Sequence, residues 1–288
     1  MCLVALAYRL HPRWPLVLIA NRDEAHARAT APAGFDPDAG DAGEVYGGRD
    51  LEAGGSWLQV STRGRLAAVT NVRRGLEPEQ ARRSRGWLVR DFVRGDRSAQ
   101  AFADALEADA ADYGRFNLLL WDGDALWFAG NHPGYDARPV TPGFHAMSNG
   151  AFDAPWPKST SATRTLQQWI EAPQPMGDID RDAGDAIETQ LAPLFAGLRD
   201  TRIAPDAVLP DTGVGLALER RLSPPFIEDP VYGTRCSSVV LAGARDLLFA
   251  ERRFAAAGRA ARERSRGLVL FIDEIQSADA DGIKALAY

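Results

Sequence analysis

The chain has 288 residues, of which 45% are hydrophobic and 25% charged, a composition typical of a globular protein with a sizeable core. Its net charge of −6 argues against a nucleic-acid-binding surface, and no apolar run is long enough to cross a membrane as a helix. Its two cysteines are too few for a disulfide scaffold, and its four histidines lack metal-ligand spacing, so no metal or obligatory cofactor is predicted.

The first predicted elements are two short strands that form a hairpin. They cover residues 2–10 and 15–20, which are apolar runs joined by a turn. The polar tetrad Asn21-Arg22-Asp23-Glu24 is expected where the second strand ends. Residues 30–48 are rich in Ala, Pro, Gly and Asp, so a long surface loop is expected there.

Blocks of strands and blocks of helices follow along the chain. In order, we predict a hairpin over 57–60 and 66–71, helices over 84–95 and 98–113 with Ser98 as N-cap, a hairpin over 117–121 and 125–129, a strand over 145–150, helices over 161–170 and 183–198, a loop over 201–217, and a hairpin over 234–242 and 246–254. Such blocks favour an α+β fold with antiparallel sheets over alternating βα units. We therefore expect two stacked sheets with helices outside them, in a single domain over 1–288.

Cys2 is the residue around which a catalytic site is predicted. If Met1 is removed, Cys2 carries both a thiol nucleophile and a free α-amine, and an α-amine with a pKa of about 7.7–8.0 suits a general base. The alternative is a small apolar residue near a strand end. The N-terminus lacks the pattern of a signal peptide, so a cytoplasmic location is expected.

Polar residues at other strand ends are candidate partners for Cys2. Asp23 is placed to orient an N-terminal amine, and the side chains of Asn71 and Asn149 are suitable donors to an oxyanion. Arg235 opens a late strand with a cation. The alternative for each is ordinary turn or surface chemistry. Cys236 is predicted to be a packed strand residue.

Several short motifs together resemble a known family, the NRDE or transport and Golgi organisation family. They are Cys2 after Met1, Asn21-Arg22-Asp23-Glu24, Gly47-Gly48-Arg49-Asp50, Gly55-Ser56-Trp57, Thr70-Asn71, Ser84-Arg85-Gly86, Phe116-Asn117-Leu118-Leu119, Met147-Ser148-Asn149, Pro155-Trp156-Pro157-Lys158, Gly233-Thr234-Arg235 and Ser237-Ser238-Val239. The motifs run from residue 2 to about 255. The family is similar to N-terminal nucleophile hydrolases of the choloylglycine hydrolase and penicillin V acylase type.

That similarity implies a four-layer αββα fold and a set of site residues. Asn21-Arg22-Asp23 matches the Asn-x-Asp of these hydrolases, and Asn71, Asn149 and Arg235 match their later site residues. This chain has Ala20 where the hydrolases carry an arginine immediately before the motif.

Two functions remain open at this point. In the first, Cys2 attacks an amide or thioester of a small acyl substrate, while Arg22 or Arg235 binds an anionic group. Asn21, Arg22 and Trp57 are the predicted substrate-binding residues. In the second, which the family resemblance implies, the protein binds or traffics haem or an acyl-CoA-like lipid without catalysis. The aromatic residues that could pack such a ligand are Trp57, Trp87, Trp156 and Phe226, and the alternative is that they belong to the hydrophobic core.

Overall fold

The structure of the protein is a computed structural model that describes most of the chain. The described residues are 3–40, 44–77, 79–172, 184–244, 246–256, 268–272 and 283–287. Cys2, the predicted nucleophile, lies outside them.

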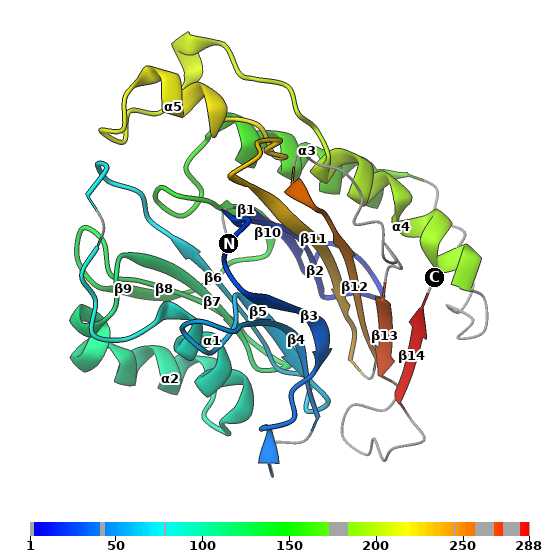
Figure 1. The fold of residues 1–288 in the computed structure, drawn as a ribbon. Helices are drawn as coiled ribbons and strands as arrows, with labels where there is room; N and C mark the ends of the chain where they lie inside the picture. Colours follow the sequence, from blue (N-terminus) through cyan, green and yellow to red (C-terminus); the bar gives the residue numbers. More distant parts are fainter. Residues whose placement is uncertain are drawn as a thin grey trace.

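Two antiparallel sheets form the centre of the molecule (Figure 1). The first has the order β10-β1-β2-β11-β12-β13-β14 and consists of β1 (Leu3–Tyr8), β2 (Leu16–Ala25), β10 (Gly143–Met147), β11 (Tyr232–Ala242), β12 (Leu247–Arg253), β13 (Leu268–Ile272) and β14 (Ile283–Ala287). The second follows chain order and consists of β3 (Thr30–Phe35), β4 (Val45–Asp50), β5 (Leu58–Ser61), β6 (Leu66–Asn71), β7 (Phe116–Trp121), β8 (Leu126–Gly130) and β9 (Asp136–Pro139).

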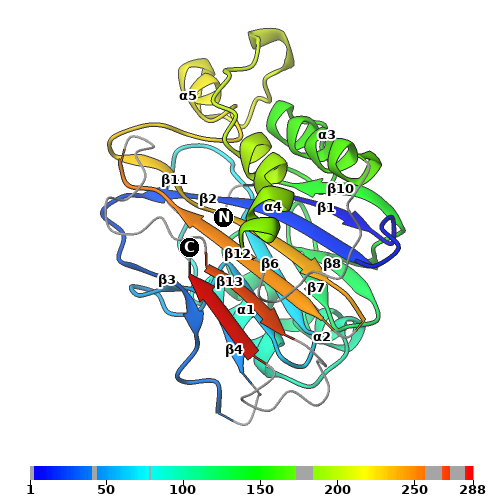
Figure 2. The same ribbon diagram turned by 90° about the vertical axis from the view of Figure 1, so that its right-hand side faces the viewer.

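Helices cover the outer face of each sheet (Figures 1 and 2). Helices α3 (Pro157–Glu171) and α4 (Gly184–Leu198) pack on the first sheet, and α1 (Arg85–Arg94) and α2 (Ala99–Leu106) pack on the second. The shorter helices are η2 (Glu107–Asp112), η3 (Asp206–Val208) and α5 (Leu216–Arg221). The predicted αββα layer order is confirmed. No helix in the described part of the chain is both long and apolar enough to cross a bilayer.

Side chains of β2 show how the layers are held together. Val17 and Ile19 pack against the helices, whereas Leu18 and Ala20 pack against the other sheet. This period of two is a property of any strand, and here it makes both faces of β2 apolar. One core therefore lies between the sheets, and two more lie beneath the helices.

Two local predictions were wrong. The tetrad from Asn21 to Glu24 does not follow β2 but belongs to it, because β11 pairs with β2 as far as Ala25. The segment 30–48 is not a single loop, since it contains β3 and most of β4. Strand β3 is the edge of its sheet, the position where Pro32 is tolerated.

The predicted hairpins and helices are otherwise confirmed, with small shifts of their ends. Ser98 caps α2 by accepting a hydrogen bond from the Ala101 amide at 3.1 Å. The helix predicted over 98–113 changes after Leu106 into the 3₁₀ helix η2. Strands β9, β13 and β14 and helix α5 were not predicted.

Candidate active site

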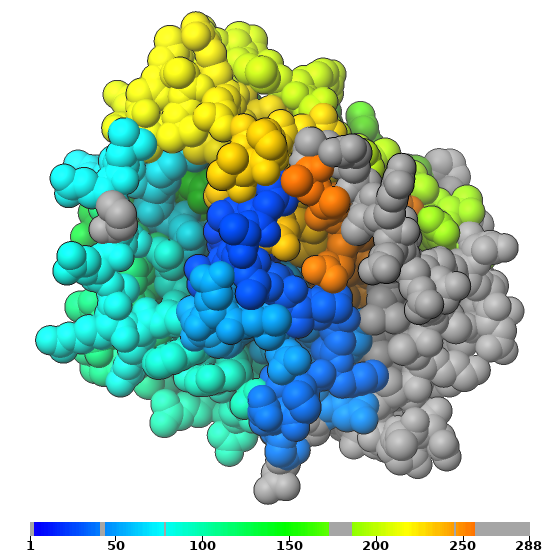
Figure 3. Space-filling model, in the orientation of Figure 1, coloured from blue at the N-terminus to red at the C-terminus, as the bar shows by residue number. Residues whose placement is uncertain are grey.

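Two adjoining cavities lie beside the ends of β2 and β6. The larger, of about 610 Å³, is bordered by β2, the β4–β5 loop, β6 and the segment leading into α1. The smaller, of about 220 Å³, is bordered by β2, β6, the segment after β10 and the start of β11. Asn71, Glu79 and Arg85 line both. In Figure 3 the blue, cyan and yellow segments that border the two cavities meet on one face.

Tight glycine contacts form one wall of the larger cavity. Gly55 has a φ of +79°, and a Cβ on it would lie 2.4 Å from backbone atoms of Gly86. The Ser56 amide donates to the Gly86 carbonyl at 3.0 Å. The loop before β5 and the first turn of α1 are thereby held together, so the glycines of the Gly-Ser-Trp and Ser-Arg-Gly motifs allow a close backbone contact.

Asp23 lies at the smaller cavity on the face of β2 that is turned toward the helices. Its side chain is buried, and its Oδ1 accepts a hydrogen bond from Thr234 Oγ1 at 2.7 Å. Thr234 is the residue paired with Asp23 in β11, and its hydroxyl also accepts from the Ile227 amide at 2.9 Å. The carboxylate is therefore fixed in one orientation.

Asn21 shares that face of β2 but lines neither cavity. Its Nδ2 donates to the carbonyls of Leu198 and Pro225 at 2.8 and 2.7 Å, and its Oδ1 accepts from Ser237 Oγ at 2.6 Å. The residue is fully buried. Its contacts tie β2 to the end of α4 and to the segment before β11.

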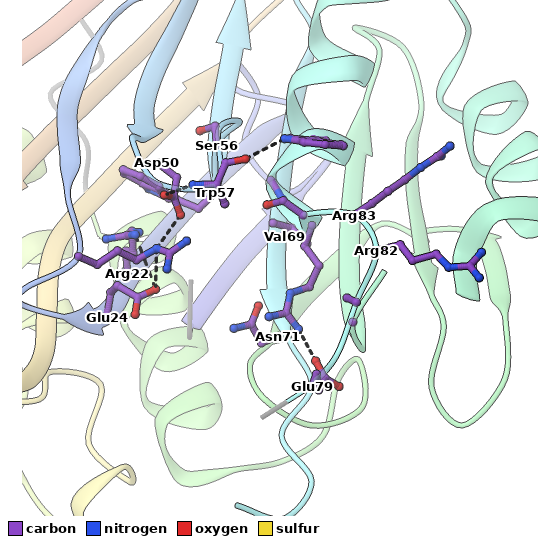
Figure 4. A pocket seen from close by; sticks show the side chains of 18 residues that line it. Arg22, Glu24, Asp50, Ser56, Trp57, Val69, Asn71, Glu79, Arg82 and Arg83 are labelled. Carbon is purple, nitrogen blue, oxygen red and sulfur yellow. Dashed lines mark hydrogen bonds and ion pairs between the residues drawn. The ribbon is translucent and has the colours of Figure 1, made fainter. Parts of the chain in front are cut away.

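Arg22 and Trp57 face each other at the larger cavity, between the sheets (Figure 4). The guanidinium carbon of Arg22 lies 4.2 Å from the centroid of the Trp57 ring, and Arg22 Nη2 lies 3.7 Å from Glu24 Oε2. Both Ala20 and Arg22 are on the face of β2 turned toward the second sheet, two residues apart. The Arg22 guanidinium therefore lies on the same face of β2 as position 20, two residues further along the strand.

Asn71 and Asn149 are brought together at the smaller cavity from different sheets. Asn149 Nδ2 donates to the Asn71 carbonyl at 3.0 Å. Asn149 Oδ1 accepts from Lys158 Nζ at 3.1 Å, and Lys158 lines the same cavity although it is only 2% exposed. Sequence reasoning assigned no role to Lys158. Two signals were available: Lys158 belongs to the Pro155-Trp156-Pro157-Lys158 motif, and the chain has only two lysines, at positions 158 and 284.

Arg235 lines neither cavity. Its Nη1 donates to the carbonyl of Ala25 at 2.8 Å and to that of Arg28 at 3.3 Å, at the turn after β2. Burial, and then the nearby positive charge of Arg22, lowers the pKa of Arg235. Of the two arginines predicted to bind an anionic group, Arg22 is the one at a cavity.

Cys236 lies between the sheets in the core, as predicted. Its side chain is buried, and burial, with the neighbouring Glu251, raises the pKa of its thiol well above the usual value. A thiol in this state is a poor nucleophile.

The described residues combine groups that acyl transfer requires besides a nucleophile. Asp23 is a buried carboxylate that can accept hydrogen bonds, and Asn71 has a side-chain amide that can donate them. Both line a cavity of about 220 Å³. Within the described part of the chain, no group of three or more His, Cys, Asp or Glu side chains is arranged to hold a metal ion.

Comparisons with known proteins agree with this picture at the level of family. The family model of Transport and Golgi organisation 2 matches residues 1–256. The Transport and Golgi organization protein 2 homolog of Bos taurus is 31% identical over 265 residues, covering 85% of this chain and 89% of that protein. The Homo sapiens homolog is 30% identical over 266 residues, with the same two coverages.

Two solved structures resemble this chain in the arrangement of their backbones. A Caenorhabditis elegans ortholog of N-acylethanolamine-hydrolyzing acid amidase has a TM-score of 0.48 and 9% identity, covering 83% of this chain and 92% of its own. A mutant conjugated bile acid hydrolase from Clostridium perfringens has a TM-score of 0.44 and 10% identity, covering 100% and 97%. Similarities at these scores do not bear on function.

Proposed function

The chain belongs to the Transport and Golgi organisation 2 family, and we propose that it is an N-terminal-cysteine hydrolase that cleaves an amide or thioester of a small acyl substrate. The observation that carries the proposal is that Asp23, Asn71 and Asn149 line one cavity. Leu3, to which Cys2 is bonded, is paired with Asn21 in β2, two residues from Asp23.

The proposed reaction begins after removal of Met1. The α-amine of Cys2 takes the thiol proton while Sγ attacks the substrate carbonyl carbon, and the carbonyl oxygen becomes an oxyanion. Asp23 orients the amine, and the side-chain amide of Asn71 donates to the oxyanion. Collapse of this intermediate breaks the C–N or C–S bond, and the amine returns the proton to the leaving group.

The second half of the reaction uses water. The α-amine takes a proton from a water molecule, which attacks the thioester on Cys2. The second intermediate releases the carboxylic acid, and the proton returns to Sγ. An anionic group of the substrate binds near Arg22 in the larger cavity, against Trp57, because the Arg22 guanidinium carbon lies 4.2 Å from the centroid of the Trp57 ring and both side chains line this cavity.

Intact-mass spectrometry with an activated acyl thioester tests the proposal. We expect the mature protein to lack Met1 and to gain one acyl group, and we expect Cys2→Ala to gain none. Cys236→Ala is the matched control, because it removes the other thiol and should acylate normally. An adduct on Cys2→Ala, or no adduct on protein that lacks Met1, would contradict the proposal.

A second candidate function is binding or trafficking of haem or an acyl-CoA-like ligand without turnover. It is favoured by the volume of the larger cavity, about 610 Å³, and by two indole rings in its wall, Trp57 and Trp87. Trp156 and Phe226 do not line this cavity. Titration of Cys2→Ala with haem, followed by absorbance, and with an acyl-CoA, followed by thermal shift, tests it. No change with either ligand would reject this candidate.

A further inference from the structure

Lys158 occupies an unfavourable place for a cation. Its side chain is only 2% exposed, and it is the second residue of α3, where the partial positive charge of the helix N-terminus opposes an ammonium group. Lysine is also among the residues that are almost never fully buried unless paired. A buried lysine at this position therefore requires a specific polar partner, and Asn149 is such a partner.

The contact with Lys158 determines which way the Asn149 amide points. An ammonium group only donates, so the atom 3.1 Å from Nζ must be the amide oxygen. The amide nitrogen is then turned to the Asn71 carbonyl, 3.0 Å away. If the amide were rotated by 180°, its nitrogen would face the Lys158 ammonium, which is a second donor. Its oxygen would face the Asn71 carbonyl, which is a second acceptor.

Asn149 holds the end of β6 at two points. Besides the contact from its side chain to Asn71, its own carbonyl accepts from the Arg73 amide at 2.8 Å. Asn149 follows β10 in the first sheet, whereas Asn71 ends β6 in the second. Lys158 and Asn149 thus connect α3 and the first sheet to the end of a strand in the other sheet, beside both cavities.

Trp156, two residues before Lys158, packs against the backbone that follows Asn149. A Cβ on Gly150 would lie 2.4 Å from the Trp156 ring, so the ring packs directly on the backbone after Asn149. The guanidinium carbon of Arg73 lies 5.6 Å from the centroid of that ring. The Pro155-Trp156-Pro157-Lys158 motif therefore packs against both partners of the 149–73 hydrogen bond.

We propose that Lys158 is a positioning residue that, through Asn149, sets the place of the Asn71 side chain at the junction of the two cavities. This inference rests on the proposed function, in which Asn71 donates to the oxyanion. Removal of the Lys158 ammonium would leave the Asn149 amide held only by its contact with the Asn71 carbonyl. The end of β6 would then lose a fixed contact, and the donor would no longer be held where charge develops.

Amide hydrogen exchange tests the positioning step without any activity. In Lys158→Met we expect exchange of the Arg73 amide to accelerate by about tenfold or more. The Val69 amide donates to the Trp57 carbonyl within the second sheet and serves as the internal reference, which should not change. Thr160→Met is the control variant, because Thr160 lies in the same turn of α3 but is exposed. Unchanged exchange at Arg73 in Lys158→Met would overturn the proposal.

Kinetics of the same variants test the consequence for catalysis. We expect Lys158→Met to lower kcat by about 10- to 100-fold and to leave KM within about twofold, because a misplaced oxyanion donor acts on the transition state. Asn149→Ala should give a similar loss, and the double variant should be no worse than either single variant. Additive losses would overturn the proposal. If the wild type forms no acyl-enzyme, the proposed function fails, while the exchange experiment still decides the role of Lys158.

Discussion

Asn21 and Arg22 are neighbours in β2, yet their side chains leave the strand on opposite faces and have different contacts. Asn21 makes three hydrogen bonds within the protein and lines neither of the two cavities. Arg22 is also buried, but its Nη1 has no hydrogen-bond partner among the described residues. The first residue is therefore expected to matter for stability and the second for ligand binding.

Replacing Asn21 with alanine should destabilise the protein. The change leaves the carbonyls of Leu198 and Pro225 and the hydroxyl of Ser237 buried without partners, and we expect a loss of about 2–4 kcal/mol in the free energy of unfolding. Urea denaturation measures this loss. Ser237→Ala removes only one of the three contacts, so it should cost about 1 kcal/mol. Equal losses for the two variants would show that the carbonyl contacts contribute little.

Replacing Arg22 with methionine should change ligand preference more than stability. Methionine keeps an apolar contact with Trp57 and removes a buried charge, so we expect the free energy of unfolding to change by no more than about 1 kcal/mol. Under the proposed function, KM for a carboxylate-bearing substrate should rise by about tenfold, and KM for its neutral analogue should not change. Arg235→Met is the comparison. If KM for the anionic substrate rises in Arg235→Met and not in Arg22→Met, the anion binds at Arg235.

The short helix α5 is an element whose place depends on one buried charge. Glu219 is 3% exposed and accepts hydrogen bonds from Arg73 Nη2 at 2.5 Å and from the amide and hydroxyl of Thr212 at 2.9 and 2.6 Å. Because Arg73 follows β6, this contact links α5 to the segment beside the smaller cavity.

Replacing Glu219 with alanine should therefore destabilise the protein, although α5 is short. It leaves the Arg73 guanidinium largely buried without its carboxylate, and we expect the unfolding free energy to fall by about 3 kcal/mol. The matched control is Arg202→Ala, which breaks the pair with Asp200 but removes a side chain that is 86% exposed, so it should cost less than about 1 kcal/mol. Chemical denaturation of both variants checks the difference. Similar small losses would mean that the Arg73–Glu219 pair contributes little to stability.

Elements with local signals could be predicted from the sequence, whereas elements that depend on distant partners could not. The Asp122-Gly123-Asp124 turn and the cap at Ser98 lie within a few residues of the elements they define. The extension of β2 through Asp23 depends on β11, and the two residues joined by the Asp23–Thr234 hydrogen bond are 211 positions apart. The polarity of Asn21 to Glu24 indicated a solvated turn. Pairing with β11 instead makes these residues part of β2, where Asn21, Arg22 and Asp23 are buried.

In the candidate site, too, residues with a local signal could be predicted, and a residue whose place depends on distant packing could not. Asp23, Asn71 and Asn149 could be proposed because each lies at or near the end of a predicted strand, and the structure brings all three to one cavity. The burial of Lys158 depends on how α3 packs beside β10, which no local pattern shows. The role of Cys2 stays a prediction.

At the scale of the whole molecule, the core between the sheets joins the two inner layers. Tyr46 of the second sheet lies in this core between two phenylalanines, with ring centroids 5.2 Å from Phe35 and 5.3 Å from Phe249, both in edge-to-face geometry. Phe249 belongs to the first sheet and is fully buried, whereas Phe35 is 44% exposed. The two rings have the same chemistry and the same aromatic neighbour but differ in burial.

This pair allows a direct test of what joins the sheets. Phe249→Ala should lower the free energy of unfolding by about 3–5 kcal/mol, because it leaves a cavity between layers that cannot collapse without moving a sheet. Phe35→Ala should cost about 1 kcal/mol, since much of that ring already contacts solvent and mainly the aromatic contact is lost. Guanidinium denaturation of both variants, with equal m-values, measures the difference. Equal losses would mean that contact with Tyr46, and not burial between the sheets, accounts for the contribution of Phe249.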